Sequence, residues 1–278
     1  MRNTSFFVPT FFRVDDFVGR GEILENLYNG LFTQADRKTH RTVTLLGMKG
    51  QGKTQIALEF CDRHRERYKH ILWFDASTRS TAERSFLSIA ARFGLQVSRR
   101  NSLDFNHLLE RIWTQLDSDE PEPKWLIVAD NADNLDKFGT IKQFLPPAVL
   151  RGRGHIIITS CNRYARDLIM GQGVSIDVEA LTVDEAVELL LRRAHLIHKW
   201  DEHEQEAVKI VNRLGCLALA VAQAGSYIAL RSLAPPRYLE EYEEEAKRLL
   251  EYRPDVWSYN YWGLAHLFSD QAHGLTIT

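Results

Sequence analysis

The sequence has few of the features that mark secreted or membrane proteins. Among its 278 residues are three cysteines, Cys61, Cys161 and Cys216, whose wide separation matches no metal-ligand spacing. We therefore expect reduced thiols, no disulfides and a cytoplasmic protein. No apolar run approaches the roughly 20 residues that a membrane-spanning helix needs. The apolar patch at residues 6–8 ends at Pro9 and is too short for the core of a signal peptide.

The sequence also lacks a strong charge of either sign. Its formal net charge of -2 at pH 7 gives no electrostatic reason to expect nucleic acid or an anionic membrane as a partner. Apolar residues make up 44% of the chain and charged residues 26%, a normal balance for one large or two small globular domains. Any binding of phosphate must therefore depend on a local site.

One stretch of the chain has the composition of such a local site. Residues 47–54 (GMKGQGKT) fit the pattern Gly, four residues, Gly, Lys and Ser or Thr. The glycines let backbone N–H groups approach phosphate oxygens, while Lys53 is expected to reach the β- and γ-phosphates and Thr54 to ligate Mg²⁺. The predicted nucleotide-binding residues here are Gly47, Gly50, Gln51, Gly52, Lys53, Thr54 and Gln55. The alternative is an ordinary glycine-rich turn between a strand and a helix.

The apolar segments around this loop predict an α/β fold. Strands are expected at residues 42–46, 70–76, 124–130, 154–160 and 174–178, with helices between them. Because these segments are apolar on both faces, we predict a three-layer α/β/α fold with a mainly parallel sheet, followed by a small helical domain. The expected divisions are a leader at 1–16, a nucleotide-binding domain at 17–181, a helical domain at 182–253 and a tail at 254–278.

Polar residues follow two of the predicted strands. Asp130 ends a continuous apolar run downstream of the glycine-rich loop, where a carboxylate that organises a metal belongs, and together with Thr54 it is the predicted Mg²⁺ ligand. The alternative is an aspartate that only caps the next turn. Ser160 and Asn162 end the next strand and face either the γ-phosphate or an ordinary turn.

The order and spacing of several motifs resemble the NB-ARC domain of the signal-transducing STAND ATPases, close to fungal NOD-like receptors. The motifs are FVGR at 17–20, GMKGQGKT at 47–54, HILWFDAS at 70–77, WLIVADNAD at 125–133, GHIIITSCNR at 154–163, LTVDEAVELL at 181–190 and LGCLALAVAQAG at 214–225. The resemblance implies a P-loop NTPase fold that holds ADP or ATP with Mg²⁺. It also implies that Val18, Gly19 and Arg20 lie beside adenine and ribose, and that Leu217 and Leu219 lie against the base.

The resemblance also implies a function. In such proteins ADP locks a closed monomer, and exchange for ATP opens it into an oligomer that passes on a signal in innate immunity. The implied partners are adenine nucleotide and related NB-ARC chains in a homo- or hetero-oligomer. The winged-helix and repeat domains of the family have no counterpart in residues 261–278, so we expect a truncated gene product, a fragment or a minimal regulatory form.

Three departures from the family pattern predict slow or absent hydrolysis. Asn131 takes the place of the second acid that positions the attacking water and is a poor base, although it and Asp130 are the catalytic candidates. Cys161 replaces the sensor arginine, and Ala218 replaces the proline of the helical-domain motif. Two other hypotheses stay open: an active ATPase or phosphotransferase, and a degenerate interaction module without nucleotide.

Overall fold

The computed structural model describes residues 5–7, 13–32, 40–95, 102–116, 125–134, 141–147, 154–169 and 172–242. Contacts within the chain divide it into two units. The first comprises Met1–Thr10, Arg20–Met48 and Lys53–Val178, and the second Phe11–Gly19, Lys49–Gly52 and Glu179–Thr278. The predicted tail at 254–278 lies outside the described residues.

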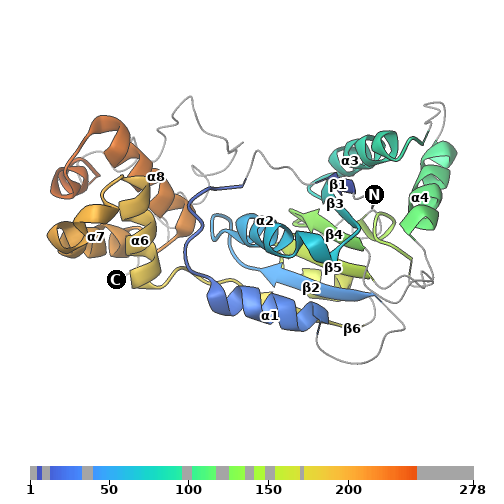
Figure 1. Cartoon of the computed structure of the whole chain (residues 1–278), viewed down its shortest axis with the longest axis horizontal. Helices are drawn as coiled ribbons and strands as arrows, with labels where there is room; N and C mark the ends of the chain where they lie inside the picture. Colours follow the sequence, from blue (N-terminus) through green and yellow to red (C-terminus); the bar gives the residue numbers. More distant parts are fainter. Residues whose placement is uncertain are drawn as a thin grey trace, which may run out of the picture. The chain divides into compact units, whose positions relative to one another are not determined.

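A parallel sheet forms the centre of the first unit (Figure 1). Its six described strands are β1 (Ser5–Phe7), β2 (Arg41–Leu46), β3 (His70–Asp75), β4 (Trp125–Asp130), β5 (Gly154–Ser160) and β6 (Gln172–Asp177). They lie in the order β1-β3-β4-β5-β2-β6, and every neighbouring pair is parallel. The predicted α/β fold is therefore confirmed, and β1 is a strand that the sequence reading did not anticipate.

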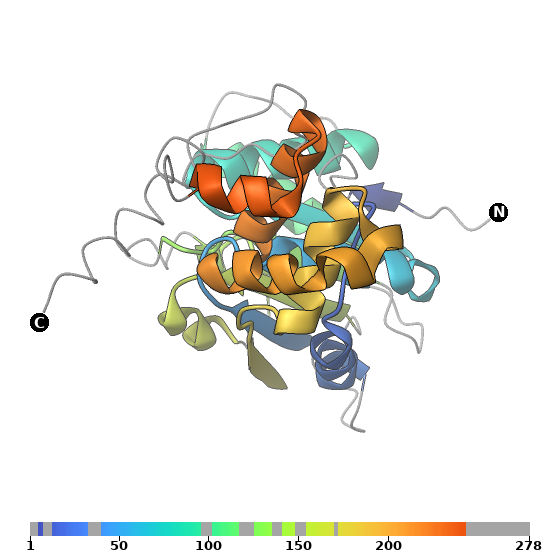
Figure 2. The ribbon, with the colours of Figure 1, turned by 90° about the vertical axis from the view of Figure 1, so that its left-hand side faces the viewer.

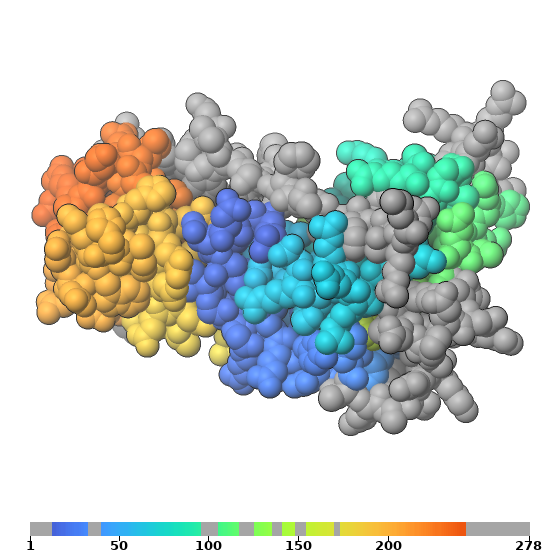
Figure 3. All heavy atoms as spheres, in the orientation of Figure 1, coloured from blue at the N-terminus to red at the C-terminus, as the bar shows by residue number. Residues whose placement is uncertain are grey.

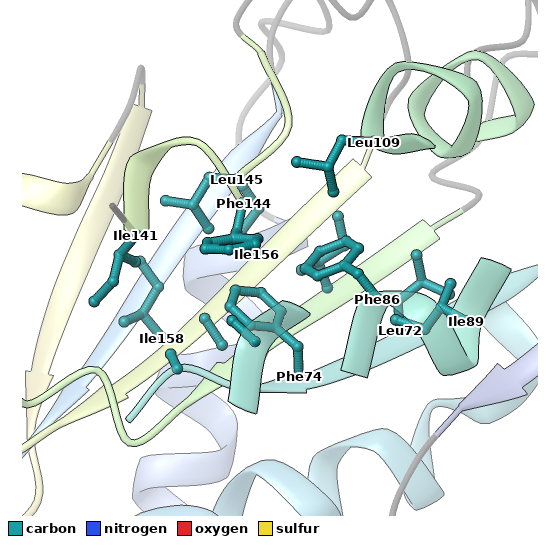
Figure 4. Close-up of a cluster of buried hydrophobic side chains, with 14 of the residues drawn as sticks. Leu72, Phe74, Phe86, Ile89, Leu109, Ile141, Phe144, Leu145, Ile156 and Ile158 are labelled. Atoms are coloured by element: carbon teal, nitrogen blue, oxygen red, sulfur yellow. The ribbon is translucent and has the colours of Figure 1, made fainter. Parts of the chain in front are cut away.

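Helices cover both faces of this sheet. They are α1 (Gly21–Phe32), α2 (Lys53–Arg63), α3 (Arg79–Arg92) and α4 (Ser102–Leu116), with short 3-10 helices η2 (Arg65–Arg67) and η4 (Arg163–Leu168). Side chains alternate between the two faces along each strand. Leu72, Ile127 and Ile156 belong to one face and to the buried cluster with α3 and α4. Figure 4 shows part of this cluster, with Leu72 and Ile156 among its labelled side chains. The neighbouring residue His155 faces the other way, where its ring packs edge-on against Phe32 of α1.

The second unit is a helical bundle. Its helices are α6 (Val183–Arg193), η5 (Ile197–Lys199), α7 (Trp200–Arg213) and α8 (Ala218–Arg231), and residues 235–242 are also helical (Figure 2). Apolar residues at helical spacing build its core, which includes Leu190, Ile210 and Val221. The segment before α1 joins this core through Val18, and the Asp16 carboxylate lies 3.9 Å from the Arg193 guanidinium group. Figure 3 shows the atoms of the described residues as spheres, with the helical bundle in yellow to orange.

The helices have the local sequence signals that such elements require. Thr182 begins α6 with a reciprocal capping box, in which its hydroxyl accepts the Glu185 N–H and the Glu185 carboxylate accepts the Thr182 N–H. Helix α8 ends at Arg231, and its C-cap residue Ser232 has a left-handed backbone. None of the helices in the described part of the chain has both the length and the apolar character that crossing a membrane requires.

Candidate functional site

The glycine-rich loop connects β2 to α2, as the sequence predicts. Gly50 has φ 85° and Gly52 has φ 90°, values in the region that favours glycine because it has no Cβ. The N–H of Gly47 donates to the carbonyl of Ser160 at 3.2 Å, which ties the start of the loop to the end of β5. Gly50 and Gly52 are therefore needed for the shape of the loop.

The first turn of α2 presents a cation and a hydroxyl. The ammonium group of Lys53 donates to the carbonyls of Gly47 at 2.7 Å and Met48 at 2.9 Å. The hydroxyl of Thr54 donates to Asp130 Oδ1 at 2.9 Å. This turn contains no acidic residue, and the unpaired N–H groups and dipole of a helix N-terminus favour an anion. The local charge therefore suits phosphate.

Asp130 is a buried carboxylate at the carboxyl end of β4. Only 6% of the residue is exposed, and the Thr159 hydroxyl donates to its Oδ1 at 2.5 Å. Burial raises the pKa of Asp130 to about 6. The nearby Asp75 carboxylate also raises this pKa, whereas the hydrogen bonds from Thr159 and Thr54 and the Lys53 cation lower it. A divalent cation at this carboxylate would offset the cost of its burial.

The oxygen atoms at this position fit Mg²⁺. Thr54 supplies a hydroxyl and Asp130 a carboxylate, and Mg²⁺ prefers oxygen ligands. Within the described residues, no group of three or more His, Cys, Asp or Glu side chains could hold a metal. Mg²⁺ beside a bound nucleotide generally uses one or two protein ligands and takes the others from phosphate and water.

Asn131 directs its side chain toward Asp130. Its φ is 62°, a left-handed value that asparagine tolerates better than most residues. Its N–H donates to Thr159 Oγ1 at 2.9 Å, and its side-chain amide lies 3.4 Å from Asp130 Oδ2. The amide can therefore support the ionised form of Asp130, but it has no basic group with which to take a proton from water.

Ser160 follows Thr159, the residue of β5 whose hydroxyl donates to Asp130. It is fully buried, and its hydroxyl donates to the carbonyl of Ala132 at 2.6 Å and to Asp133 Oδ1 at 3.2 Å. The same Asp133 oxygen accepts the N–H of Cys161 at 2.6 Å. These contacts connect the ends of β4 and β5, and the contact of Ser160 with nucleotide stays a prediction.

The turn before α1 contacts the start of α6. Gly19 has φ 65°, and a Cβ at this position would meet the carboxylate of Glu185. Arg20 follows with φ 60° and is buried, and Val18 belongs to the helical core. The left-handed backbone therefore favours glycine at position 19, and a Cβ there would also displace the Glu185 side chain. Glu185 lies beside this turn, and the sequence motifs do not single it out.

Part of the glycine-rich loop packs on the start of α8. The carbonyl of Gly50 accepts the N–H of Leu219 at 3.0 Å. A Cβ on Gly50 would come within 3.3 Å of the Leu219 Cβ and 3.4 Å of Leu217 Cδ2. Gln51 is buried as well. The structure thus brings Leu217 and Leu219 to the loop, and their predicted contact with the adenine base stays a prediction.

Comparisons with known proteins show which family this chain resembles. The chain matches the family described as the NB-ARC domain over residues 20–197. A nucleotide-binding leucine-rich repeat (NLR)-like protein from Hyaloscypha variabilis is 28% identical over 88% of this chain and 25% of its own length. A protein from Arabidopsis thaliana described as a disease resistance protein is 25% identical over 78% of this chain and 25% of its own length. The chain spans about a quarter of the length of these curated relatives.

A solved structure shows the same fold. Cdc6p from Pyrobaculum aerophilum has a TM-score of 0.58 and 18% sequence identity, covering 86% of this chain and 70% of its own. At this identity the similarity concerns the fold alone.

Proposed function

Because this chain belongs to the NB-ARC domain family, we propose that it is a signalling switch that binds ADP and ATP, with slow or absent hydrolysis. Its nucleotide-binding domain has the P-loop NTPase fold. The observation that carries the proposal is the arrangement of the glycine-rich loop, Lys53, Thr54 and Asp130. An ammonium group, a hydroxyl and a carboxylate meet there, as binding of a nucleoside triphosphate with Mg²⁺ requires.

Each group has a role in holding the nucleotide. The backbone N–H groups from Gly47 to Gln55 bind the phosphates, and Lys53 neutralises the β- and γ-phosphate charge. Thr54 and Asp130 would hold Mg²⁺, which when bound shields the phosphate charge. The turn from Val18 to Arg20 would lie beside adenine and ribose. Ser160, Leu217 and Leu219 complete the proposed set of nucleotide-binding residues.

The residues after Asp130 favour retention of the nucleotide over its hydrolysis. Asn131 cannot act as a base, and its amide lies against Asp130. Cys161 stands where the sensor arginine of the family is expected, and a thiol cannot stabilise phosphate charge as a guanidinium group does. A steady-state turnover near one ATP per second, on the order of ordinary enzyme rates, would favour the alternative of an active ATPase or phosphotransferase.

The relatives support a role in signalling. They are described as an NLR-like protein and a disease resistance protein, and each is about four times as long as the matched region. We propose that exchange of ADP for ATP changes the conformation and allows the chain to join an oligomer with related NB-ARC chains. In this proposal the switch acts in innate immunity.

A thermal-shift measurement with ADP and Mg²⁺ tests the binding. At ADP concentrations 100 times the Kd, binding should stabilise the wild type by about 2.7 kcal/mol, a rise in Tm of roughly 5–10 °C. Lys53→Ala should lose most of this rise. The matched control is Lys69→Ala, an exposed lysine before β3, which should keep it. No rise in the wild type would contradict the proposal and favour an interaction module without nucleotide.

A further inference from the structure

A second carboxylate lies beside Asp130 on the neighbouring strand. Asp75 ends β3 and pairs in register with Asp130 at the end of β4. In a parallel sheet, residues in register point to the same face. Asp130 contacts Thr54 of α2, so this face is the one on which the phosphate loop begins its helix. The Asp75 side chain therefore leaves the sheet on the side of the proposed phosphate site.

Local contacts fix the orientation of this carboxylate. The Oδ1 atom of Asp75 accepts the N–H of Ser77 at 2.9 Å, and its own N–H donates to Ser85 Oγ at 3.3 Å. The carbonyl of Asp75 accepts the hydroxyl of Thr81 at 3.1 Å. Within the part of the chain that the structure describes, no group donates to Asp75 Oδ2. One oxygen is thus anchored and the other is available.

The other acids at the same edge of the sheet have different partners. Asp133 accepts the N–H of Cys161 and the hydroxyl of Ser160. Asp177, at the end of β6, accepts Arg166 through both oxygens at 3.0 Å. Among the described acids at these strand ends, Asp75 lies beside Asp130 and has a carboxylate oxygen, Oδ2, that accepts no hydrogen bond from a described residue. The influence of Asp75 on the pKa of Asp130 supports their proximity.

We propose that Asp75 is the catalytic carboxylate that holds and activates water when bound ATP is hydrolysed, a role that Asn131 cannot fill. This inference rests on the proposed nucleotide site. The water oxygen forms a bond to the γ-phosphorus while the bond between that phosphorus and the β–γ bridging oxygen breaks. The water proton passes to Asp75 Oδ2, and the products are ADP and inorganic phosphate.

The position of Asp75 also accounts for a slow reaction. Its Cα lies one strand spacing, about 4.8 Å, beyond Asp130, on the side of β4 away from β5 and β2. Aspartate has the shortest carboxylate side chain. In this proposal Asp75 therefore acts on the γ-phosphate through a water molecule, and it cannot bring that water close to phosphorus. A longer acid at this position should hold the water closer to phosphorus.

Phosphate analogues provide a test that does not depend on turnover. ADP with beryllium fluoride imitates bound ATP, whereas ADP with aluminium fluoride and an in-line water imitates the transition state. Asp75→Asn retains an oxygen that can accept the Ser77 N–H. We expect it to bind ADP and ADP with beryllium fluoride within twofold of the wild type, and to bind ADP with aluminium fluoride at least tenfold more weakly. Single-turnover ATP hydrolysis should fall at least tenfold.

Two further variants make the result decisive. Asp177→Asn removes an exposed strand-end carboxylate at the far edge of the sheet and should leave both analogue affinities and hydrolysis unchanged. Asp75→Glu should hydrolyse ATP at least as fast as the wild type. This variant also tests the role of the carboxylate if Asp75→Asn does not fold.

The inference is overturned if Asp75→Asn binds both analogues with the affinities of the wild type and hydrolyses ATP at the wild-type rate. It is also overturned if Asp75→Glu loses hydrolysis. It is also overturned if the wild type binds ATP but forms no ADP in an extended single turnover, although the proposed switch then stands. Calorimetry that detects no ADP or ATP binding would instead contradict the proposed function itself.

Discussion

His155 shows how burial of one residue controls stability. It is 6% exposed, and its Nδ1 lies 2.7 Å from the hydroxyl of buried Tyr68. Burial lowers the pKa of His155 to about 3, and the Arg41 cation acts in the same direction. In the unfolded chain the pKa returns to about 6.5. The folded protein therefore binds fewer protons than the unfolded chain between about pH 3 and 6.5, and stability falls as the pH falls through this window.

The expected size of this effect can be measured. Acidification from pH 7 to pH 5 should cost the wild type about 2 kcal/mol of unfolding free energy through His155. His155→Gln, which cannot be protonated, should lack this part of the loss even if its stability at pH 7 is lower. Urea unfolding at the two pH values measures the difference, and the exposed His107→Gln should behave as the wild type. Equal pH dependence of His155→Gln and the wild type would contradict the assignment.

At the scale of elements, a single glycine sets how closely α6 and α8 approach. A Cβ on Gly225 would lie 2.5 Å from the Cβ of Arg193 and 2.6 Å from the carbonyl oxygen of Leu190. Gly225→Ala should destabilise the protein by about 1–3 kcal/mol because the helices must separate, although alanine is the better helix former.

A matched glycine provides the control. Gly21 begins α1, and an added Cβ there would meet no atom within 4 Å. Gly21→Ala should be neutral or stabilise the protein by up to about 1 kcal/mol. Urea unfolding of both variants checks the pair. If Gly225→Ala were as stable as Gly21→Ala, the close packing of α6 on α8 would be wrong.

Local patterns predict the elements well. Apolar runs identify β2 to β6, because this signal lies in consecutive residues. The glycine-rich loop and the strand-ending acid predict a site at Lys53, Thr54 and Asp130, and the structure places Thr54 within hydrogen-bond distance of Asp130. The structure confirms the α/β fold that these patterns predict. The sequence does not predict the strand β1, because three residues are too few to show an alternating pattern.

Residues that depend on strand order could not be predicted in this way. The sequence gives no sign that Thr159 contacts Asp130, because the side chains of neighbouring residues lie on opposite faces of a strand and only the pairing of β4 with β5 decides which one meets Asp130. Asp75 becomes relevant only because β3 pairs with β4 in a particular register. Register results from contacts between distant segments, which motif spacing does not contain.

At the scale of the whole molecule, the phosphate loop belongs to both units by its contacts. Residues 49–52 group with the helical unit, whereas Lys53 and Thr54 group with the sheet. The hydrogen bond from Leu219 to the Gly50 carbonyl is a direct link between the loop and α8. A nucleotide that holds the loop in place should therefore also hold the first turn of α8.

Hydrogen exchange can detect this coupling. The Leu219 amide can exchange only when its bond to Gly50 opens, and a nucleotide that stabilises the loop makes this opening rarer. We expect saturating ADP with Mg²⁺ to slow exchange at least tenfold in peptides that cover residues 215–224, as well as in those that cover 47–56. In Lys53→Ala neither segment should respond. If ADP protected the loop but left the start of α8 unchanged, the Gly50 to Leu219 contact would not transmit nucleotide binding, and the switch would need another route into the helical unit.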